Sequence, residues 1–360
     1  MKGLVFCNKG IEEISKLEIK GLIGKESTLF EEYLTFDCSK EELCKLTYLM
    51  QTINKTVLIL KSLKFKNNED VIKNTQKIDF TEWLDNRTFK VEVRNHDYKE
   101  LEGDIGKEII DNIKVKPKVD LDDPDIIVYV FIDNDLVYYG IDFSGADLSK
   151  RGYRIYSSPR NIKSTIAYAM LRMSDYKKGE VFLDPLCLSG SIAIEAALYN
   201  NNFPVRYFEK DEFLFNKFKD FNFEKIDKNI TKDKNNINAF DNHFRNIDAS
   251  KKNAKIAGIN KAIHFSKIDV NWLDTKFKEN AVDRLVTCLP TLSKHADRDS
   301  VLKLFKEFFH QAEYIVKGST VVCCRDKEVK DIAKEKGLKL KLEKEVWQGH
   351  EGFLLLKFEK

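Results

Sequence analysis

One run of apolar residues that leads into an acidic residue and a tight turn constrains the fold of this chain more than any other stretch. Residues 181–198 read V-F-L-D-P-L-C-L-S-G-S-I-A-I-E-A-A-L. Apolar residues continue to Asp184 and then recur at helical spacing, so we expect a buried strand over 181–184 and a helix that opens near Gly190 or Ser191. Such a unit points a backbone loop and a helix N-terminus at a ligand above a parallel sheet. The same pattern also fits an ordinary strand and helix that bind nothing.

The residues after 181 alternate between strand and helix patterns, which is typical of a doubly wound sheet. Further strands are expected at 237–241, 263–269, 284–288, 320–324 and over the C-terminal run F-L-L-L-K-F. A helix is expected from His243 to Ala257, where Gly258 ends it. Residues 200–236, rich in Asn, Lys and Phe, interrupt the alternation and read as an insertion.

The first 148 residues mix strand patterns with amphipathic helix patterns and predict α+β structure. Residues 1–62 contain strand patterns at 4–7 and 56–60 and helix patterns at 11–22 and 40–52. Residues 63–148 contain a strand at 89–94, a helix at 101–113 and a hairpin of strands at 126–132 and 136–141. Neither pattern indicates a function by itself.

Basic residues crowd the segment 149–178, which also carries the apolar stripe of a helix. The whole chain has a net charge of only +3, so this excess is local. Four tyrosines, at 153, 156, 168 and 176, lie between the basic residues. Lysine and arginine neutralise phosphates, and aromatic rings stack on unpaired bases. We therefore expect RNA phosphates to be contacted by Lys150, Arg151, Arg154, Arg160 and Lys163.

Three aspartates fall at the ends of consecutive expected strands. Asp184 ends the first strand, Asp241 the second and Asp269 the third. Carboxylates at the carboxyl ends of parallel strands accept hydrogen bonds from ribose hydroxyls and from an adenine amino group. A single aspartate at a strand end is more often a turn residue, but three at equivalent positions predict a nucleoside-binding crevice.

Cysteine spacing and hydropathy argue against several classes of protein. The seven cysteines include no C-x-x-C pair and no histidine at ligand spacing, so we expect no disulfide framework, no metal and a reduced, cytoplasmic environment. The first residues hold no apolar run of signal-peptide length. The longest apolar run, 126–132, has seven residues, far fewer than a membrane span needs, so no membrane association is expected.

The turn after the first strand, D-P-L-C-L-S-G-S, is similar to the D-P-x-C-G-S-G-T signature with which class I methyltransferases bind S-adenosyl-L-methionine. Over nearly its whole length the chain resembles RNA guanine-N2 methyltransferases that carry an N-terminal THUMP domain. The D-L-D-D-P-D element at 120–125 is a recurring feature of THUMP domains.

The resemblance implies four parts. They are a ferredoxin-like domain over 1–62, a THUMP RNA-binding domain over 63–148, a basic linker helix over 149–178 and a class I, Rossmann-like α/β methyltransferase domain over 179–360. It implies RNA, in particular tRNA, as the partner, with no DNA expected, and the methyltransferase strand order with an antiparallel last strand. It places the cofactor contacts at Asp184, Leu188, Gly190, Ser191, Asp241 and Asp269.

Two motifs depart from this family. Leu188 stands where the family has a glycine, and it costs about 1–2 kcal/mol if the backbone there is left-handed. The catalytic positions, which hold Asn, Pro, Pro and Tyr in the family, are here Cys288, Leu289, Pro290 and Thr291.

In the family, the asparagine oxygen and the first proline carbonyl accept hydrogen bonds from the exocyclic amine, and the aromatic ring stacks on the base. Cysteine is a poor acceptor, so we expect a transfer rate lower by about 100–1,000-fold. Threonine forfeits stacking worth about 1–3 kcal/mol. Cys288 could instead be a nucleophile for pyrimidine methylation, but no acid or base at suitable spacing supports that role.

These observations support two hypotheses. The first is an RNA-binding protein of the S-adenosyl-L-methionine-dependent tRNA guanine-N2 methyltransferase type, with impaired activity. The second is a non-catalytic tRNA-binding paralogue whose methyltransferase domain is a scaffold. Binding of the cofactor discriminates between them, because it tests the loop that contains Leu188 directly.

Overall fold

The computed structural model describes residues 1–94, 96–157, 161–231, 236–292 and 297–360. The chain divides into two compact units. The N-terminal unit comprises Met1–Phe6, Lys16–Leu148 and Phe208–Asn222. The C-terminal unit comprises Cys7–Ser15, Ser149–Tyr207 and Phe223–Lys360.

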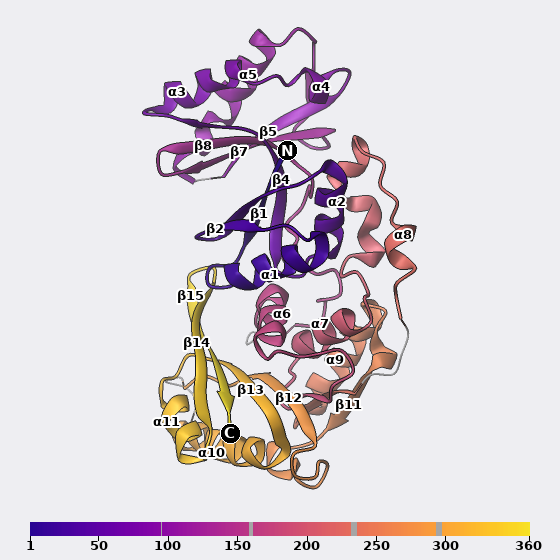
Figure 1. Ribbon diagram of the computed structural model, residues 1–360, viewed down its shortest axis with the longest axis vertical. Coiled ribbons are helices and arrows are strands. Elements are labelled where there is room, and N and C mark those ends of the chain that lie inside the picture. The colour runs from indigo at the N-terminus through magenta and orange to yellow at the C-terminus, as the bar shows by residue number, and fades with distance from the viewer. Residues whose placement is uncertain (95, 158–160, 232–235, 293–296) are drawn as a thin grey trace. The chain divides into compact units, whose positions relative to one another are not determined.

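The N-terminal unit is built on an eight-stranded sheet in the order β2-β3-β1-β4-β8-β7-β5-β6 (Figure 1). Its strands are β1 (Lys2–Cys7), β2 (Ser27–Phe30), β3 (Tyr33–Asp37), β4 (Ile53–Lys64), β5 (Thr88–Arg94), β6 (Lys118–Val119), β7 (Ile126–Asp133) and β8 (Leu136–Asp142). The α-helices of this half of the chain are α1 (Glu12–Ile23), α2 (Lys40–Leu49), α3 (Asn68–Lys73), α4 (Thr81–Leu84) and α5 (Glu102–Asn112).

Local sequence explains where these elements begin and which of them are buried. Helix α2 starts with a capping box, in which the Glu42 amide donates to Ser39 Oγ at 3.1 Å and the Ser39 amide donates to Glu42 Oε2 at 2.8 Å. Strand β7 is almost continuously apolar and lies inside the sheet, between β8 and β5. Strand β5 alternates buried and half-buried residues, as its alternating sequence predicts.

Strand β4 passes through the expected boundary between residues 62 and 63 without a break. It lies next to β1 on one side and pairs antiparallel with β8 on the other, so the two expected domains share one sheet. The division into a ferredoxin-like part and a THUMP part at residue 62 therefore stays a prediction.

The C-terminal unit contains a seven-stranded sheet in the order β11-β10-β9-β12-β13-β15-β14. Its strands are β9 (Phe182–Asp184), β10 (Ile237–Asp241), β11 (Ile263–Lys267), β12 (Val282–Cys288), β13 (Val316–Cys324), β14 (Lys339–Gln348) and β15 (Glu351–Glu359). Strands β9 to β13 pair in parallel, and β15 is antiparallel to both of its neighbours. The expected methyltransferase order with an antiparallel last strand is confirmed.

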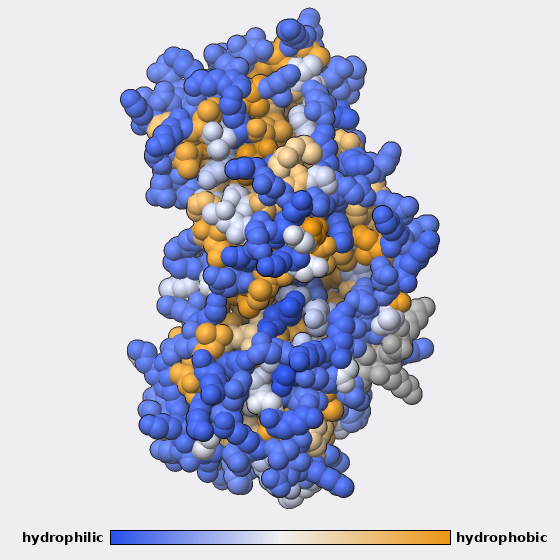
Figure 2. All heavy atoms as spheres, viewed as in Figure 1, coloured by the Kyte–Doolittle hydropathy of each residue, from blue (hydrophilic) through white to orange (hydrophobic). Residues whose placement is uncertain are grey.

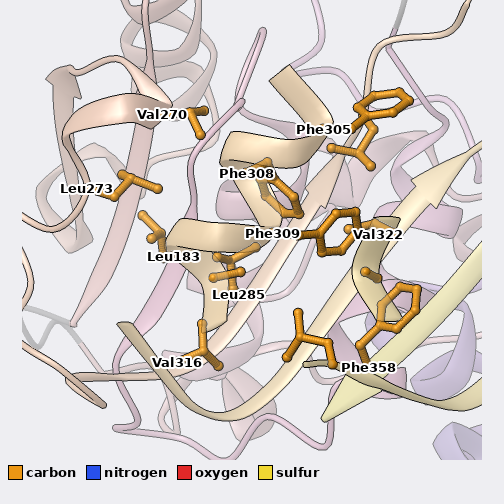
Figure 3. Close-up of a cluster of buried hydrophobic side chains, with 14 of the residues drawn as sticks. Leu183, Val270, Leu273, Leu285, Phe305, Phe308, Phe309, Val316, Val322 and Phe358 are labelled. Atoms are coloured by element: carbon orange, nitrogen blue, oxygen red, sulfur yellow. The ribbon is translucent and has the colours of Figure 1, made fainter. Parts of the chain in front are cut away.

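Helices cover this sheet, and a large apolar cluster lies between one of them and the strands. The helices are α6 (Ser164–Met173), α7 (Ser191–Asn200), α9 (Phe244–Ile256), α10 (Arg298–Ile315) and α11 (Glu328–Glu335). Figure 3 shows Phe308 and Phe309 of α10 beside the sheet side chains Leu285 and Val322, and all four are fully buried. Burial of this much apolar surface fixes the sheet whose strand ends carry the site.

The expected insertion at 200–236 forms only short helical turns where it is described. They are η3 (Tyr207–Glu212), η4 (Leu214–Lys217) and α8 (Glu224–Asp227). Its middle part, Phe208–Asn222, belongs to the N-terminal unit, where the Phe215 amide donates to the Phe143 carbonyl at 3.2 Å. The chain thus returns to the N-terminal unit at Phe208, before it completes the C-terminal sheet.

Figure 2 shows a face on which hydrophilic residues dominate and apolar residues form small patches. Among the described residues, no helix combines the length and the apolarity that crossing a bilayer demands.

Candidate functional site

The loop between β9 and α7 has the strand–turn–helix form that its sequence predicts. Strand β9 ends at Asp184, and α7 begins at Ser191 with Gly190 as its cap residue at φ +85°. A Cβ on Gly190 would lie 3.0 Å from the Cβ of Ser250, so both the left-handed backbone and the close approach of α9 favour glycine there.

Leu188 takes a left-handed conformation, with φ +50°. A left-handed backbone is strained at a leucine, because of its Cβ, and costs about 1–2 kcal/mol of stability. Two hydrogen bonds hold the backbone in place: the Leu188 amide donates to Asp241 Oδ2 at 3.1 Å, and Ser250 Oγ donates to the Leu188 carbonyl at 2.9 Å. The glycine of the family therefore occupies a position that requires a positive φ. In this chain the hydrogen bonds to Asp241 and Ser250 hold Leu188 in that conformation.

A cavity opens at the carboxyl ends of the parallel strands. It is lined by Leu186, Leu188, Asp241, Asn242, His243, Asn246, Asp269, Val270, Cys288, Leu289, Pro290 and Leu304. The structure thus brings together residues that the sequence separates by about a hundred positions, including two of the three acids and three of the four catalytic positions.

Asp184 lies beneath this cavity and is fully buried. Thr287 Oγ1 donates to its Oδ1 at 2.7 Å, while its Oδ2 has no partner among the residues that the structure describes. Burial, assisted by the nearby charge of Asp241, raises the pKa of Asp184 to about 7. The first acid is therefore a buried group under the crevice rather than a member of its lining.

The other two acids face the cavity. Asp241 accepts hydrogen bonds at 2.9 Å from the His243 amide and from Asn246 Nδ2, besides the one from Leu188. Asp269 is half-buried and accepts from the Asn271 amide at 3.0 Å. Strand β11 ends at Lys267, two residues earlier than expected, so Asp269 lies in the turn after the strand.

The expected catalytic positions lie at the end of β12 and in the loop after it, and three of them line the cavity. Cys288 is the last residue of β12, and its Cα is paired in register with that of Cys323. The Leu289 amide donates to the Cys323 carbonyl at 2.9 Å, which fixes the loop backbone to the neighbouring strand. Thr291 is half-buried and does not line the cavity, whereas Leu289 and Pro290 do.

One of the expected RNA contacts, Arg151, is buried, whereas the others that the structure describes are at least partly exposed. The Arg151 side chain is fully buried, and its Nε donates to Glu195 Oε1 at 3.0 Å. The same carboxylate oxygen accepts from the Tyr153 hydroxyl at 2.7 Å. A guanidinium buried in this way is turned away from solvent, so the pairing argues against the predicted phosphate contact of Arg151, which stays a prediction. Helix α7 supplies a carboxylate partner that the linker sequence does not reveal.

The remaining candidates differ in exposure. Lys150 is exposed, and Arg154 and Lys163 are partly exposed, which leaves their predicted role open. Arg160 lies outside the described residues. Of the four interleaved tyrosines only Tyr156 is exposed, at 43%, and the other three are buried. Stacking on a base is therefore restricted to Tyr156.

Helix α9 supplies supporting residues that the sequence reading missed. Besides Ser250, Asn253 Nδ2 donates to the Ser189 carbonyl at 3.0 Å, so two side chains of one helix hold the cofactor loop. The signal was present in the sequence, because Ser250 and Asn253 are polar residues on the buried side of an amphipathic helix. Polar residues at buried positions are kept where they satisfy backbone groups.

The chain matches known families and proteins over both units. The model of an RMKL-like methyltransferase domain matches residues 151–354, and that of a THUMP domain matches residues 65–142. The chain is similar to a protein named tRNA (guanine(6)-N2)-methyltransferase from Methanocaldococcus jannaschii, with 32% identity over 96% of each chain. A protein of the same name from Archaeoglobus fulgidus is 28% identical over 54% of this chain and 53% of its own.

Two solved structures share the fold over the whole chain. A methyltransferase crystallised with SAH gives a TM-score of 0.83 at 20% identity and covers 99% of this chain and 97% of its own. TrmN from Thermus thermophilus gives a TM-score of 0.73 at 20% identity and covers 100% of this chain and 99% of its own.

A sheet in this strand order, with a crevice at the carboxyl ends of β9, β10 and β12, defines a Rossmann-like methyltransferase domain. The chain belongs to the RMKL-like methyltransferase family and carries a THUMP domain ahead of the methyltransferase domain. The family depends on S-adenosyl-L-methionine.

Proposed function

We propose that this chain is a tRNA-binding protein of the S-adenosyl-L-methionine-dependent guanine-N2 methyltransferase type, with an impaired transfer step. The observation that carries the proposal is the crevice itself, where Asp241 and Asp269 face the same cavity as Cys288 and Leu289. Membership of the family and the whole-length similarity to a tRNA methyltransferase support the same substrate class. A reduced, cytoplasmic setting suits seven cysteines that are all free.

The residues of the crevice fit the nucleoside half of the cofactor. Asp241 and Asp269 offer carboxylate oxygens to hydroxyl and amino groups. Ser191, the first residue of α7, does not line the cavity, and its buried Oγ has no hydrogen-bond partner within the described parts of the chain. Leu188 lines the same cavity and narrows it where the family has no side chain, so we expect weakened affinity. S-adenosyl-L-methionine supplies the methyl group when it is bound.

The catalytic loop retains one of its two expected hydrogen-bond acceptors. The Leu289 carbonyl takes the place of the proline carbonyl, and it can accept from an exocyclic amine as any backbone carbonyl can. The Cys288 thiol, a weak acceptor, cannot replace the asparagine oxygen. With one acceptor left, the amine is held by a single contact, and transfer should be slower by about 100–1,000-fold than with both.

The second candidate function is a non-catalytic tRNA-binding paralogue. The strained Leu188 favours it, since a side chain at the cofactor loop excludes ligand atoms from that volume. In this case the methyltransferase domain serves as a scaffold that contacts RNA and transfers no methyl group.

Two measurements on the purified chain separate these functions. Calorimetric titration with S-adenosyl-L-methionine is expected to give measurable binding, and transfer of a tritiated methyl group to unmodified tRNA is expected to be slow. Absence of cofactor binding would refute the impaired enzyme. Tight binding together with rapid transfer would refute both candidates.

A variant that restores the asparagine and the tyrosine of the family motif tests the cause of the slow methyl transfer. The double variant Cys288→Asn, Thr291→Tyr should accelerate methyl transfer by about 100-fold, because it returns a strong acceptor and a stacking ring. Leu289 is kept, because a proline there would remove the hydrogen bond from its amide to Cys323. Cys288→Ser, Thr291→Val is the matched control and should leave the rate low.

A further inference from the structure

A second basic part of the C-terminal unit lies outside the linker. Residues 244–267, which span α9 and β11, hold six lysines and arginines and one aspartate, a net charge of +5. The whole chain carries +3, so the rest of it has a net charge of −2. An excess of one sign within 24 residues of a chain that is otherwise slightly acidic produces a local positive field.

These charges line a groove between α9 and β11. Three lysines of α9, Lys251, Lys252 and Lys255, form one wall, and His264 and Phe265 of β11 form the other, around a space of about 370 Å³. Strand β11 is the edge strand of the seven-stranded sheet, and all three lysines are exposed. The groove is therefore open to a ligand from solvent.

Most of this charge is not neutralised within the protein. Lys252 Nζ lies 2.8 Å from Asp248 Oδ2, one turn earlier on the same helix. In the part of the chain that the structure describes, Lys251 and Lys255 have no carboxylate within ion-pair distance. In the linker, Arg151 is paired with Glu195 and the Arg172 guanidinium lies 5.1 Å from the centre of the Tyr199 ring, while Lys150 and Lys177 are exposed. Lys251 and Lys255 thus give α9 free positive charge in addition to that of the linker.

An exposed aromatic ring adjoins this groove. The Tyr156 amide donates to Asn253 Oδ1 at 3.0 Å and its carbonyl accepts from Asn253 Nδ2 at 2.8 Å, so the backbone of Tyr156 is fixed to α9 from both sides. Lys252 Nζ lies 5.1 Å from the centre of the Tyr156 ring. An exposed ring next to a lysine, on a backbone that is fixed to α9, combines the two elements that bind single-stranded nucleic acid.

The same helix also borders the crevice. His243, which precedes α9, and Asn246 in its first turn line the cavity, and Lys255 lies nine residues after Asn246. At a rise of 1.5 Å per residue, the groove is roughly 14 Å along the helix from the crevice. The three lysines lie on a different face of α9 from Asn246, so a chain of nucleotides that reaches both sites passes around the helix.

We propose that this α9–β11 groove binds the phosphodiester backbone of the RNA substrate, with Lys251, Lys252 and Lys255 on phosphates and Tyr156 stacked on an unpaired base. This inference rests on the proposed function, because it assigns the substrate of the same unit. Lysines that contact phosphates do not read base identity, so the groove contributes affinity and position rather than sequence choice.

The test compares two pairs of charge reversals in the full chain. Lys251→Glu, Lys255→Glu changes the groove, and Lys334→Glu, Lys339→Glu makes the same change in charge at exposed lysines of α11 and β14. Affinity for an unmodified tRNA transcript is measured at several salt concentrations. We expect the groove variant to lose about tenfold or more, with a salt slope shallower by about 0.7–0.9 for each lost phosphate contact, and the control variant to change by less than twofold.

A second comparison tests the role of the ring. Tyr156→Ala should weaken binding to a single-stranded RNA by at least about fivefold, while Tyr156→Phe, which keeps the ring, should bind as the wild type does. Equal losses in both double variants, or unchanged affinity in the groove variant, would overturn the proposal.

Failure of this inference is distinguishable from failure of the proposed function. Cofactor titration and methyl transfer are measured on the same variants, and neither the groove lysines nor Tyr156 lines the crevice, so cofactor affinity should stay within twofold. A chain that transfers no methyl group but loses tRNA affinity in the groove variant supports the groove and refutes the enzyme. A chain that transfers methyl groups with groove and control variants equally supports the enzyme and refutes the groove.

Discussion

At the scale of single residues, Leu188 controls the cofactor loop through its backbone and its side chain. Its φ of +50° is held by Asp241 and Ser250, while its side chain lines the cavity. The two effects are separable by substitution, because alanine shortens the side chain and keeps the strain, whereas glycine removes both.

Substitution of Leu188 should therefore improve cofactor binding and stability separately. Leu188→Ala and Leu188→Gly are both expected to raise the affinity for S-adenosyl-L-methionine, by about tenfold for glycine, because they open the cavity. Only Leu188→Gly should also raise the free energy of unfolding, by about 1–2 kcal/mol, because it relieves the backbone strain. Calorimetry measures the affinities, and urea denaturation measures the stabilities. Unchanged affinity in the glycine variant would show that this side chain does not obstruct the cofactor.

Asp184 gives the native state a specific dependence on pH. Its folded-state pKa is raised from an ordinary 3.8 to about 7, so between these values the native state keeps a proton that the unfolded chain has released. The stability that this group contributes is complete below about pH 4 and is lost as the pH rises through 7. At higher pH the buried carboxylate is charged and destabilises the fold.

Replacement of this carboxyl by an amide should remove that dependence. Asp184→Asn keeps an oxygen for the Thr287 hydroxyl and carries no charge, so it should be more stable than the wild type at pH 8, by as much as about 4 kcal/mol, with a much smaller difference at pH 4. Urea denaturation at both values measures this. Asp269→Asn, at the half-buried carboxylate, is the control and should retain the pH dependence of the wild type.

At the scale of elements, a buried ion pair joins the linker to the first helix of the methyltransferase domain. Arg151 in the linker and Glu195 on α7 are both without exposed side-chain surface, and the Tyr153 hydroxyl donates to the same carboxylate. Removal of one partner of such a pair leaves an uncompensated buried charge. The position of Arg151 in a basic segment therefore reflects folding rather than RNA binding.

Charge reversal at two adjacent residues should separate these roles. Arg151→Glu is expected to lower the free energy of unfolding by roughly 3–5 kcal/mol, because it places two buried carboxylates together. Lys150→Glu, at an exposed position, should leave stability within about 0.5 kcal/mol and act only on tRNA affinity. Thermal denaturation and tRNA binding are compared for both. A stable Arg151→Glu protein with weakened tRNA binding would contradict this assignment.

At the scale of the whole molecule, the two units are not consecutive in the sequence. Phe208–Asn222 leaves the C-terminal sheet region and becomes part of the N-terminal unit. There Phe215 is fully buried, with its ring centre 6.4 Å from that of Phe143 and 5.1 Å from that of Phe213. The N-terminal unit is therefore complete only when residues from beyond position 207 are present.

A core substitution in this returning segment should destabilise the N-terminal unit. Phe215→Ala is expected to cost about 3–5 kcal/mol, the usual range for a buried phenylalanine. Limited proteolysis should then cut first within residues 16–148. Phe208→Ala, at a ring that is 66% exposed, is the control, and the protease should cut it as it cuts the wild type. Protection of residues 16–148 in the Phe215 variant would show that the segment is dispensable there.

The sequence by itself determined most elements of the C-terminal sheet, the resemblance to the family gave their order, and strand β14 (Lys339–Gln348) was not expected. Strand β10 is observed at the residues expected, and the acids at 184 and 241 end their strands, because the runs of apolar residues and their period are local properties of the chain. The positive φ at Leu188 was also foreseeable, since the family glycine marked a turn that needs it.

Tertiary structure alone decided which charges are free and which surfaces exist. Arg151 and Lys251 are both basic residues in basic segments, yet one is buried against Glu195 and the other is exposed beside β11. The return of Phe208–Asn222 to the N-terminal unit has the same origin. The sequence shows the chemistry of each residue and the periodicity of the apolar positions. The partner of a charge or of an aromatic ring depends instead on which distant elements pack together.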